Sequence, residues 1–310
     1  MGSICATQDE QTSKLINDYY EKQHKKEERI KKILLLGSGA SGKSTLFKQL
    51  GWLYGVKEAD KNYTDTDAED RLAKIRENMS QNIVVLLKKS QELYDRDNIK
   101  YIECKVDFNN KNDDRVKTII KDIQYVAQFQ NVQFIETQKT EQELALLGES
   151  IHRLWMLNEI KTTFKHRQVF SFSDNMDYFF DKSIEIFKAN YRCTKQDFLR
   201  TRVRTTGVTK IELEVPNIDE NGNPSTKELN KFQIIDVGGQ RNERNKWIHQ
   251  FDNVVSVLFV AALDHYATVL FEDETENAMQ ESLELFEQIV TLKHFVKTEM
   301  ILFLNKKDLF

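Results

Sequence analysis

The chain has 310 residues, of which 40% are hydrophobic and 30% charged, and its formal net charge is −4. This length suggests two domains, and the hydrophobic content is sufficient for a sizeable core. The acidic balance gives no reason to expect nucleic acid as a partner, and no apolar run approaches the roughly 20 residues of a membrane-spanning helix. Three scattered cysteines without metal-ligand spacing are typical of a reducing cytosol.

The first segment in chain order resembles a lipid-modification signal. Gly2 follows the initiator methionine as in N-myristoylation signals, although Ala6 stands where Ser or Thr is preferred. Cys5 is a candidate for palmitoylation, and the basic residues of 25–32 favour attraction to anionic lipid. From the residues alone, dual lipid anchoring and an unmodified end both remain open. A helix with a narrow apolar face is predicted over 12–29.

Residues 32–50 predict a strand, a phosphate-binding loop and a helix. The apolar run 33–36 is typical of a buried parallel strand, and 45–50 favours a helix. Between them, GSGASGKS at 37–44 fits G-x-x-x-x-G-K-[ST] at every specified position, so backbone N–H groups can face phosphate oxygens. The lysine supplies charge and the final serine a hydroxyl for Mg²⁺. We predict a nucleoside polyphosphate site that includes Gly39, Ala40, Ser41, Gly42, Lys43, Ser44 and Thr45.

The pattern then becomes helical. Apolar residues at three- and four-residue steps predict helices over 67–93, 116–126, 144–155 and 176–187, with a polar loop at 107–114. No convincing strand pattern lies between 56 and 192. These observations predict an all-helical domain inserted into another domain.

Strand patterns return after this block. Strands are predicted at 209–215 and 232–237, joined by a turn-rich segment at 216–226 that contains Asn221-Gly222. Apolar runs at 254–263 and 300–304 predict two more strands, with a helix at 277–292 between them. The alternation indicates a doubly wound α/β sheet. The predicted domains are an N-terminal helix (1–31), an α/β domain (32–56 and 202–310) and a helical insertion (57–201).

Two strand ends carry candidate chemistry. Asp236 could hold Mg²⁺ through water, Gly239 could offer its N–H to a γ-phosphate, and Gln240 could orient an attacking water. A carboxylate at Asp308 could accept N1–H and N2–H of guanine, while Asn305 and Lys306 brace that loop. These patterns predict a guanine nucleotide as the ligand.

A basic segment, RTRVRTTG at 200–207, lies just before the first strand of the hairpin. Alternation predicts that Arg200, Arg202 and Arg204 share one face. A guanidinium from this segment could stabilise charge that develops on a transferring phosphoryl group.

At GSGASGKST, LRTRVRTTG, DVGGQR, KWIHQF and FLNKKDL, and along essentially its whole length, the chain resembles the alpha subunits of heterotrimeric G proteins. The resemblance implies a Ras-like P-loop GTPase sheet with an inserted all-helical domain and an N-terminal helix. It implies a GTP-hydrolysing switch that uses GTP/GDP and Mg²⁺. The implied partners are a beta-gamma dimer, a seven-helix receptor, an effector enzyme or channel, regulators of GTP hydrolysis and the inner face of the plasma membrane.

The resemblance also implies roles for single residues. Ser44 and Thr205 become Mg²⁺ ligands, Arg202 the built-in arginine finger and Gln240 the residue that positions water. The remaining nucleotide contacts that it implies are Asp174, Asn175, Leu199, Arg200, Thr201, Val237 and Gly238.

Four features depart from the family pattern. Ala40 replaces a glutamate that normally pairs with the arginine finger, and Asn175 replaces a serine. The hairpin loop at 216–231 is longer than expected. The chain stops at Phe310, where the family continues with a helix, a strand and a helix, so a C-terminally truncated subunit is expected. Two alternatives remain open: another P-loop enzyme such as an ATP-dependent kinase, which Asp308 disfavours, and a non-catalytic module that sequesters beta-gamma or an effector.

Overall fold

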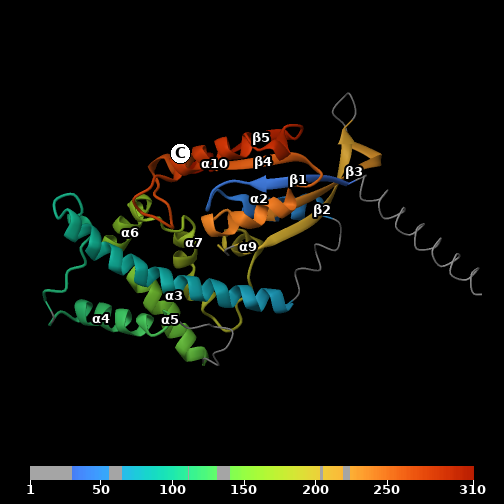
Figure 1. Cartoon of the computed structure of the whole chain (residues 1–310). Helices are drawn as coiled ribbons and strands as arrows, with labels where there is room; N and C mark the ends of the chain where they lie inside the picture. Colours follow the sequence, from blue (N-terminus) through green and yellow to red (C-terminus); the bar gives the residue numbers. More distant parts are fainter. Residues whose placement is uncertain (1–29, 56–64, 111, 131–139, 203–204, 219–223) are drawn as a thin grey trace, which may run out of the picture. The chain divides into compact units, whose positions relative to one another are not determined.

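The computed structural model describes residues 30–55, 65–110, 112–130, 140–202, 205–218 and 224–310 (Figure 1). Its contacts divide the chain into two compact units. Unit 1 comprises Met1–Ala59, Thr205–Ala261 and Leu285–Leu304, and unit 2 comprises Asp60–Arg204, Ala262–Glu284 and Asn305–Phe310. The predicted helix at 12–29 lies outside the described residues, and the domain boundaries predicted from the sequence stay a prediction.

A five-stranded sheet of order β2-β3-β1-β4-β5 organises unit 1. The strands are β1 (Ile30–Leu36), β2 (Val208–Ile218), β3 (Pro224–Val237), β4 (Val254–Ala262) and β5 (Glu299–Asn305). The central strand β1 runs parallel to β3 and β4, whereas β2 is antiparallel to β3. Leu35 lies opposite Asp236 of β3, so the ends of β1 and β3 reach the same edge of the sheet. This register places two predicted motifs side by side.

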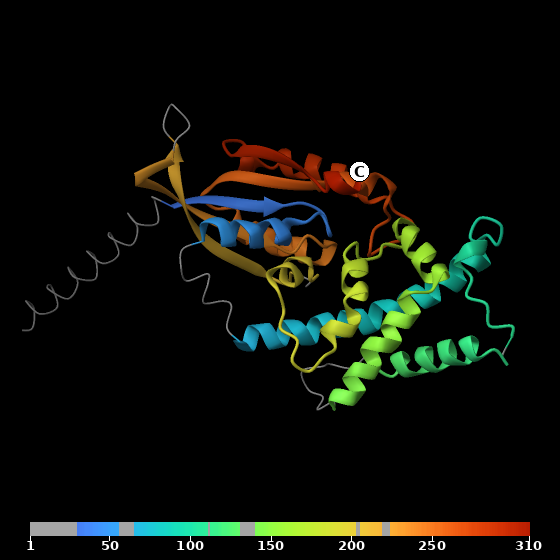
Figure 2. The same ribbon diagram turned by 180° about the vertical axis from the view of Figure 1, so that it is seen from behind.

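Alternate residues of β1 face two separate cores. Leu35 packs with Phe47 of α2 (Lys43–Tyr54) on one face, where Figure 2 shows this helix crossing the sheet. Leu34 and Leu36 pack on the other face with Leu285 of α10 (Ala278–Val290). Because side chains of a strand alternate between faces, a continuous apolar run is what a doubly covered strand requires.

The hairpin of β2 and β3 corrects the predicted turn. The sequence places a loop at 216–226, yet β2 continues to Ile218 and β3 begins at Pro224, with Pro216 opposite Leu229. Among the described residues, the pairing of β1 with β3 starts at Ile30 opposite Lys231, and beyond that point only β2 and β3 pair with each other. Pro216 is tolerated there because β2 is an outer strand of the described sheet, where a missing N–H removes no ladder bond on its open side. Residues 219–223 lie outside the described part.

Helices form most of unit 2. They are α3 (Asp65–Arg96), α4 (Asp114–Ala127), α5 (Glu141–Trp155), α6 (Asn158–Lys165), α7 (Met176–Asp181), α8 (Ser183–Ile186) and α9 (Lys195–Arg200). Short 3₁₀ helices are η2 (Ile102–Cys104), η3 (Arg167–Phe170), η4 (Arg241–Gln250), η5 (Leu263–Ala267), η6 (Lys293–Phe295) and η7 (Lys307–Leu309), of which η4 and η6 belong to unit 1. Among the described residues between 56 and 192 the chain has no strand, as predicted.

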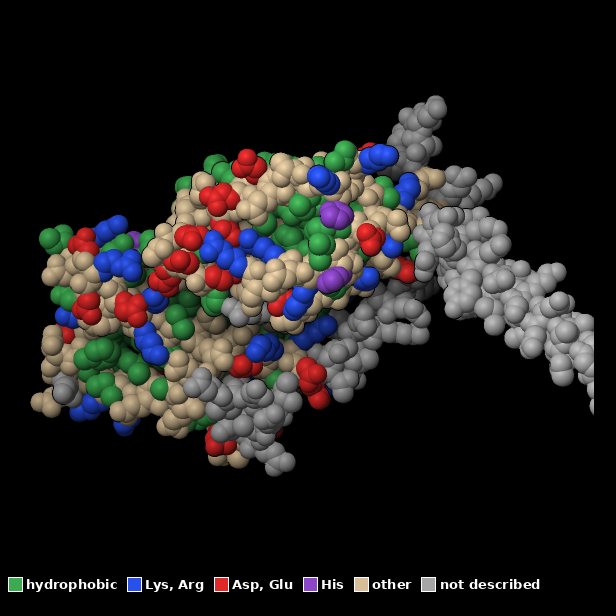
Figure 3. Space-filling view, viewed as in Figure 1, with side chains coloured by type: hydrophobic (Ala, Val, Ile, Leu, Met, Phe, Trp, Pro, Cys, Tyr) green, Lys and Arg blue, Asp and Glu red, His purple; other side chains and the backbone are tan. Residues whose placement is uncertain are grey.

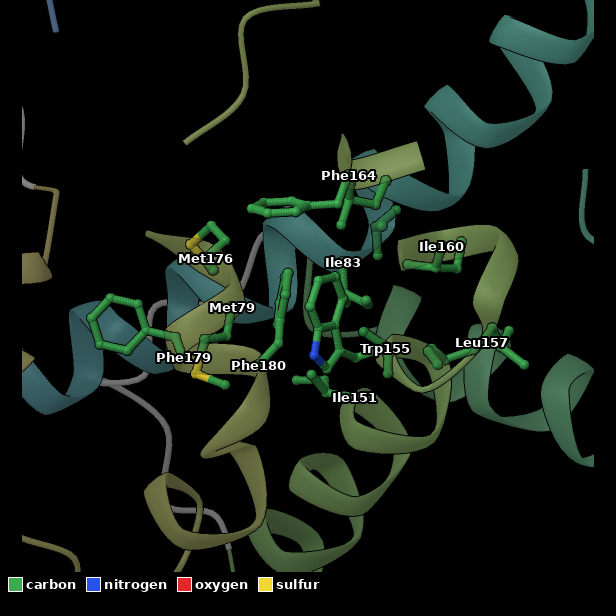
Figure 4. Close-up of a cluster of buried hydrophobic side chains, with 14 of the residues drawn as sticks. Met79, Ile83, Ile151, Trp155, Leu157, Ile160, Phe164, Met176, Phe179 and Phe180 are labelled. Carbon is green, nitrogen blue, oxygen red and sulfur yellow. The ribbon is translucent and has the colours of Figure 1, made fainter. Parts of the chain in front are cut away.

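A single apolar core holds the helices of unit 2 together. Trp155 lies at its centre in Figure 4, with its ring centroid 5.2 Å from that of Phe180 and 5.4 Å from that of Phe164. The indole Nε1 donates to Asp181 Oδ1 at 2.6 Å, so the polar atom of this large side chain is paired as burial demands.

Two local predictions for this unit need correction. The eight-residue helix α6 was not predicted, because it offers only one short apolar repeat at Ile160 and Phe164. The helix predicted over 176–187 is two short helices separated at Lys182. Lys182 lies between them with φ −94° and ψ 8°, outside the helical region.

The surface carries charged side chains of both signs, as expected from a composition with 30% charged residues. Basic and acidic side chains are interspersed on the face shown in Figure 3. The outer strand β5 exposes Ile301, Leu302, Phe303 and Leu304, each by at least 38%. In the described part of the chain, no helix has the length and apolar character needed to cross a membrane.

Candidate functional site

The phosphate loop occupies the turn between β1 and α2. Gly37 has φ 142° and Gly42 has φ 96°, and a Cβ at Gly37 would lie 2.3 Å from Val260 O. Ala40 is exposed and adopts a left-handed φ of 59°, a conformation that costs a non-glycine residue free energy. No side chain caps the start of α2, so its first N–H groups face the loop, where an anion can accept from them.

Lys43 is buried in this loop. Its Nζ donates to Gly37 O at 2.9 Å, to Ser38 O at 2.8 Å and to Ser41 Oγ at 3.4 Å. Burial lowers its pKa to about 8, because Asp236 only partly offsets the desolvation and Arg244 adds like charge. A phosphate in the loop would reverse this effect, since a nearby anion favours the ammonium form. The buried ammonium of Lys43 therefore favours an anionic ligand in this loop.

Three oxygen-bearing side chains meet beside the lysine. Ser44 Oγ lies 2.6 Å from Thr205 Oγ1, although 161 positions separate them in sequence. Asp236 is 2% exposed, and its Oδ1 has no hydrogen-bond partner within the described structure. Burial raises the pKa of Asp236, against the opposing effects of Ser44, Lys43 and Thr205. Hydroxyl and carboxylate oxygens suit Mg²⁺. Among the described residues, no group of three or more His, Cys, Asp or Glu side chains is arranged so that it could hold a metal ion.

The two glycines after β3 pack too closely for any side chain. A Cβ at Gly239 would lie 2.3 Å from Lys43 Nζ, and one at Gly238 would lie 2.6 Å from Thr205 O. Trp247 Nε1 donates to Gly238 O at 2.8 Å. Val237 is buried at the end of β3, and half-buried Gln240 immediately precedes η4. The glycines therefore bring this segment against the phosphate loop.

Lys306 forms the centre of a charged group in unit 2. It follows β5 with a left-handed φ of 58°. Its Nζ lies 2.9 Å from Asp174 Oδ2 and 3.2 Å from Asp264 Oδ2, and Arg167 Nε reaches Asp174 Oδ1 at 3.3 Å. Burial raises the pKa of Asp174, but Lys306 and Arg167 outweigh it and hold that pKa below its usual value. Asp308 is exposed in η7, and Asn305 is half-buried.

The sequence did not single out Asp264 or Arg167. Asp264 lies two residues after the end of β4, whereas Asp236 is the next-to-last residue of β3, and an acidic residue near the end of a buried strand could have drawn attention to it. Arg167 lies in η3 and has no motif that marks it. Two predicted site residues, Asp174 and Lys306, are thus joined through an ion pair that the motifs did not predict.

Two residues of the arginine segment, Arg200 and Arg202, have contacts within unit 2. Asn175 Nδ2 donates to Arg200 O at 3.4 Å, and Asn78 Nδ2 donates to Arg202 O at 3.2 Å. The Arg202 guanidinium lies 5.5 Å from the Phe271 ring centroid. Leu199 and Arg200 belong to α9, so the predicted extended alternation does not include Arg200. Arg204 lies outside the described residues, as do Gly2 and Cys5.

The phosphate loop, the parallel sheet and the glycine-rich strand end define a P-loop nucleotide-binding protein of the Ras-like type. Residues 10–310 match the family described as G-protein alpha subunit. The chain is 33% identical to the guanine nucleotide-binding protein alpha-15 subunit of Caenorhabditis briggsae, over 100% of this chain and 78% of that protein. It is 35% identical to the G(o) subunit alpha of Locusta migratoria, over 90% and 68%.

A third relative, the alpha-2 subunit of Glycine max, is 36% identical over 92% of this chain and 68% of its own length. The chain belongs to the G-protein alpha subunit family. It is accordingly a guanine nucleotide-binding GTPase that acts as a signalling switch. The predicted resemblance and fold class are confirmed, and the alternative of an ATP-dependent kinase is set aside.

The first prediction concerns Gly239. Gly239→Ala would place a methyl group against Lys43 Nζ and two loop carbonyls, so the lysine must leave its position. We expect at least tenfold weaker binding of a non-hydrolysable GTP analogue, about 1.4 kcal/mol, measured by fluorescence titration. Gly51→Ala in α2 is the matched control, because its new Cβ meets Ile211 at an ordinary 3.4 Å. Unchanged affinity in the Gly239 variant would contradict this role.

The second prediction is a pH dependence carried by Asp197. Burial opposes ionisation of this carboxyl, but bonds from Tyr191, Thr194 and Tyr178 lower its pKa to about 2. Because the folded-state pKa lies below the unfolded value of 3.8, the stabilisation is complete above pH 4 and disappears as pH falls toward 2.

Asp197→Asn should therefore lose about 2 kcal/mol of unfolding free energy at pH 7 and flatten the acid-unfolding profile between pH 4 and 2. Urea titrations across this range measure both effects. Asp114→Asn is the control, because its side chain is 96% exposed. A parent and a variant with parallel acid profiles would show that Asp197 carries no such stabilisation.

Proposed function

We propose that this alpha subunit couples a seven-helix receptor to an effector, as the nucleotide-dependent member of a heterotrimer with a beta-gamma dimer. The observation that carries the proposal is the convergence of Lys43, Ser44, Thr205, Asp236 and Gly239 at one edge of the sheet. These groups come from three separate segments, and together they suit a polyphosphate and its cation. The family supports receptor, effector, beta-gamma and regulator partners in general.

The residues that the sequence predicts for GTP hydrolysis have distinct tasks. Lys43 and the loop N–H groups bind the phosphates, and Gln240 orients a water for in-line attack. Arg202 stabilises the charge that develops on the transferred phosphoryl group. Ser44 and Thr205 would hold Mg²⁺ with Asp236 beside them, and the bound ion supplies neutralisation of phosphate charge. The remaining predicted contacts stay proposals for the same nucleotide.

Guanine selectivity is assigned to the loop after β5. Asp308 accepts N1–H and N2–H of guanine, and Lys306 covers the base while Asp174 and Asp264 hold its ammonium group. An adenine base has no matching pair of donors, so the carboxylate distinguishes the two purines. This assignment makes GTP and GDP the resident ligands.

A membrane location is part of the proposal. Gly2 and Cys5 would carry myristate and palmitate, and 25–32 would add electrostatic attraction to the cytoplasmic face of the plasma membrane. One acyl chain binds a bilayer only marginally, so two signals are required for stable attachment.

The catalytic roles have a direct test. Gln240→Leu and Arg202→Cys should each slow single-turnover GTP hydrolysis by at least a hundredfold, because one removes water orientation and the other charge stabilisation. Binding of GTP should stay within about twofold of the parent. Arg115→Cys, at an exposed position in α4, is the control. A parental rate in either catalytic variant removes that residue from the mechanism.

Base selection is tested at Asp308. Asp308→Asn replaces two acceptors by one acceptor and one NH₂ donor, so the preference should move from GTP to XTP. Competition of both nucleotides against a fluorescent GDP analogue measures the change. Asp252→Asn, another exposed carboxylate, should leave the preference for GTP intact. Retention of GTP preference by the Asp308 variant would show that another group reads the base.

Lipid attachment is tested with labelled myristate. The parent should incorporate the label on expression with an N-myristoyltransferase, and Gly2→Ala should lose it because the acceptor amine must be that of glycine. Ser3→Ala should keep the label. A parent chain that takes up no label would refute the first of the two anchors.

A further inference from the structure

A charged cluster in unit 2 has no role in the site described above. We call it the Asp197 cluster, and it consists of Tyr178, Lys182, Tyr191 and Asp197. Asp197 is fully buried. Its Oδ1 accepts from Tyr178 OH at 2.7 Å and Lys182 Nζ at 3.1 Å, and its Oδ2 accepts from Tyr191 OH at 2.6 Å. Lys182 also donates to both tyrosine oxygens, at 3.1 Å and 3.0 Å.

The cluster fixes the short helix that leads into the arginine segment. Thr194 N donates to Asp197 Oδ2 at 2.7 Å, and Asp197 N donates to Thr194 Oγ1 at 3.1 Å, which is a capping box for α9. A helix of six residues has little stability of its own. Its orientation therefore depends on the carboxylate that joins it to Lys182 and the tyrosines.

Contacts continue from this helix to the arginines. Thr201 donates to Asp197 O through its N at 2.9 Å and through its Oγ1 at 2.5 Å. The Arg200 guanidinium lies 4.5 Å from the ring centroid of Tyr178, a member of the cluster. Arg202 lies two residues after Arg200, and Asn78 Nδ2 donates to its carbonyl oxygen. A shift of Asp197 would thus move the backbone that carries Arg202.

A buried ion pair is weak evidence for a stabilising role, because desolvation offsets much of the attraction. The cluster can still position Arg202 without adding net stability, since a charge-stabilising group must be in place before the transition state forms. A misplacement of about 1 Å can cost on the order of a hundredfold in rate.

We propose that the Asp197 cluster positions Arg202, and that Lys182 holds the side chains of the cluster together. The inference rests on the proposed catalytic role of Arg202. Lys182 donates to Asp197 and to both tyrosines, so it acts through Asp197 and α9. It is a positioning residue for GTP hydrolysis.

The test uses Lys182→Met, which keeps the aliphatic stem and removes the ammonium group. In the full chain we expect single-turnover hydrolysis to slow by 10- to 100-fold, with GTP affinity within about twofold of the parent. Tyr191→Phe, which removes one bond to Asp197, should slow it less. Lys161→Met is the matched control, because that ammonium lies over Trp155 at 5.6 Å in the same unit and outside the cluster.

A double-mutant cycle separates positioning from a merely structural role. In an Arg202→Ala background, Lys182→Met should cause no further loss of rate, because no guanidinium remains to be placed. An equal loss in both backgrounds, or an unchanged rate in both cluster variants, overturns the proposal. A parental rate in Arg202→Ala alone instead refutes the proposed function of the arginine, and with it the need for a positioning device.

Discussion

The burial of one ammonium group is the constraint on which the nucleotide site depends. Lys43 lies under its own loop and bonds to two loop carbonyls, at a pKa lowered to about 8. Keeping a charge in that position costs free energy, which an anionic ligand recovers. The same ammonium excludes any side chain at Gly239, so the segment after β3 must approach the phosphate loop as bare backbone.

The sheet creates this constraint through its register. Leu35 pairs with Asp236, so the phosphate loop and the Asp236–Gln240 segment leave the sheet at the same edge. Thr205, just before β2, lies against Ser44, so its hydroxyl joins the Ser44 hydroxyl and the Asp236 carboxylate. In unit 2, contacts between charged side chains hold separate segments together. Two carboxylates hold Lys306, and the buried Asp197 holds the helix that precedes the arginines.

The sequence predicts best where a residue's type and spacing are themselves the mechanism. The loop at 37–44, the central strands and the long helix α3 all have strong local periodicity or a complete motif, and each forms as predicted. Prediction fails where tertiary contacts decide. The strands beside Pro216 and Pro224 extend further than turn residues suggest, and the helix predicted over 176–187 is interrupted at Lys182, whose side chain donates to Asp197.

The candidate site likewise contains residues that the sequence predicts and residues that only the fold reveals. Asp174 and Lys306 could be named from a family pattern, but Asp264 could not, because only the fold brings the end of β4 to the loop after β5. Ala40 departs from the family glutamate and is found exposed with a left-handed backbone. Alanine cannot form the ion pair that a glutamate at this position would make with the arginine finger. An exposed ion pair of that kind contributes only up to about 1 kcal/mol. Its replacement is therefore compatible with a working phosphate loop.

The central claim is that the chain both binds and hydrolyses GTP. The most direct test loads the purified chain with γ-labelled GTP and follows phosphate release in a single turnover after Mg²⁺ is added. We predict exponential release that approaches one phosphate per bound nucleotide and that excess ATP does not suppress. Stable GTP binding without phosphate release would contradict the account and favour a non-catalytic binding module.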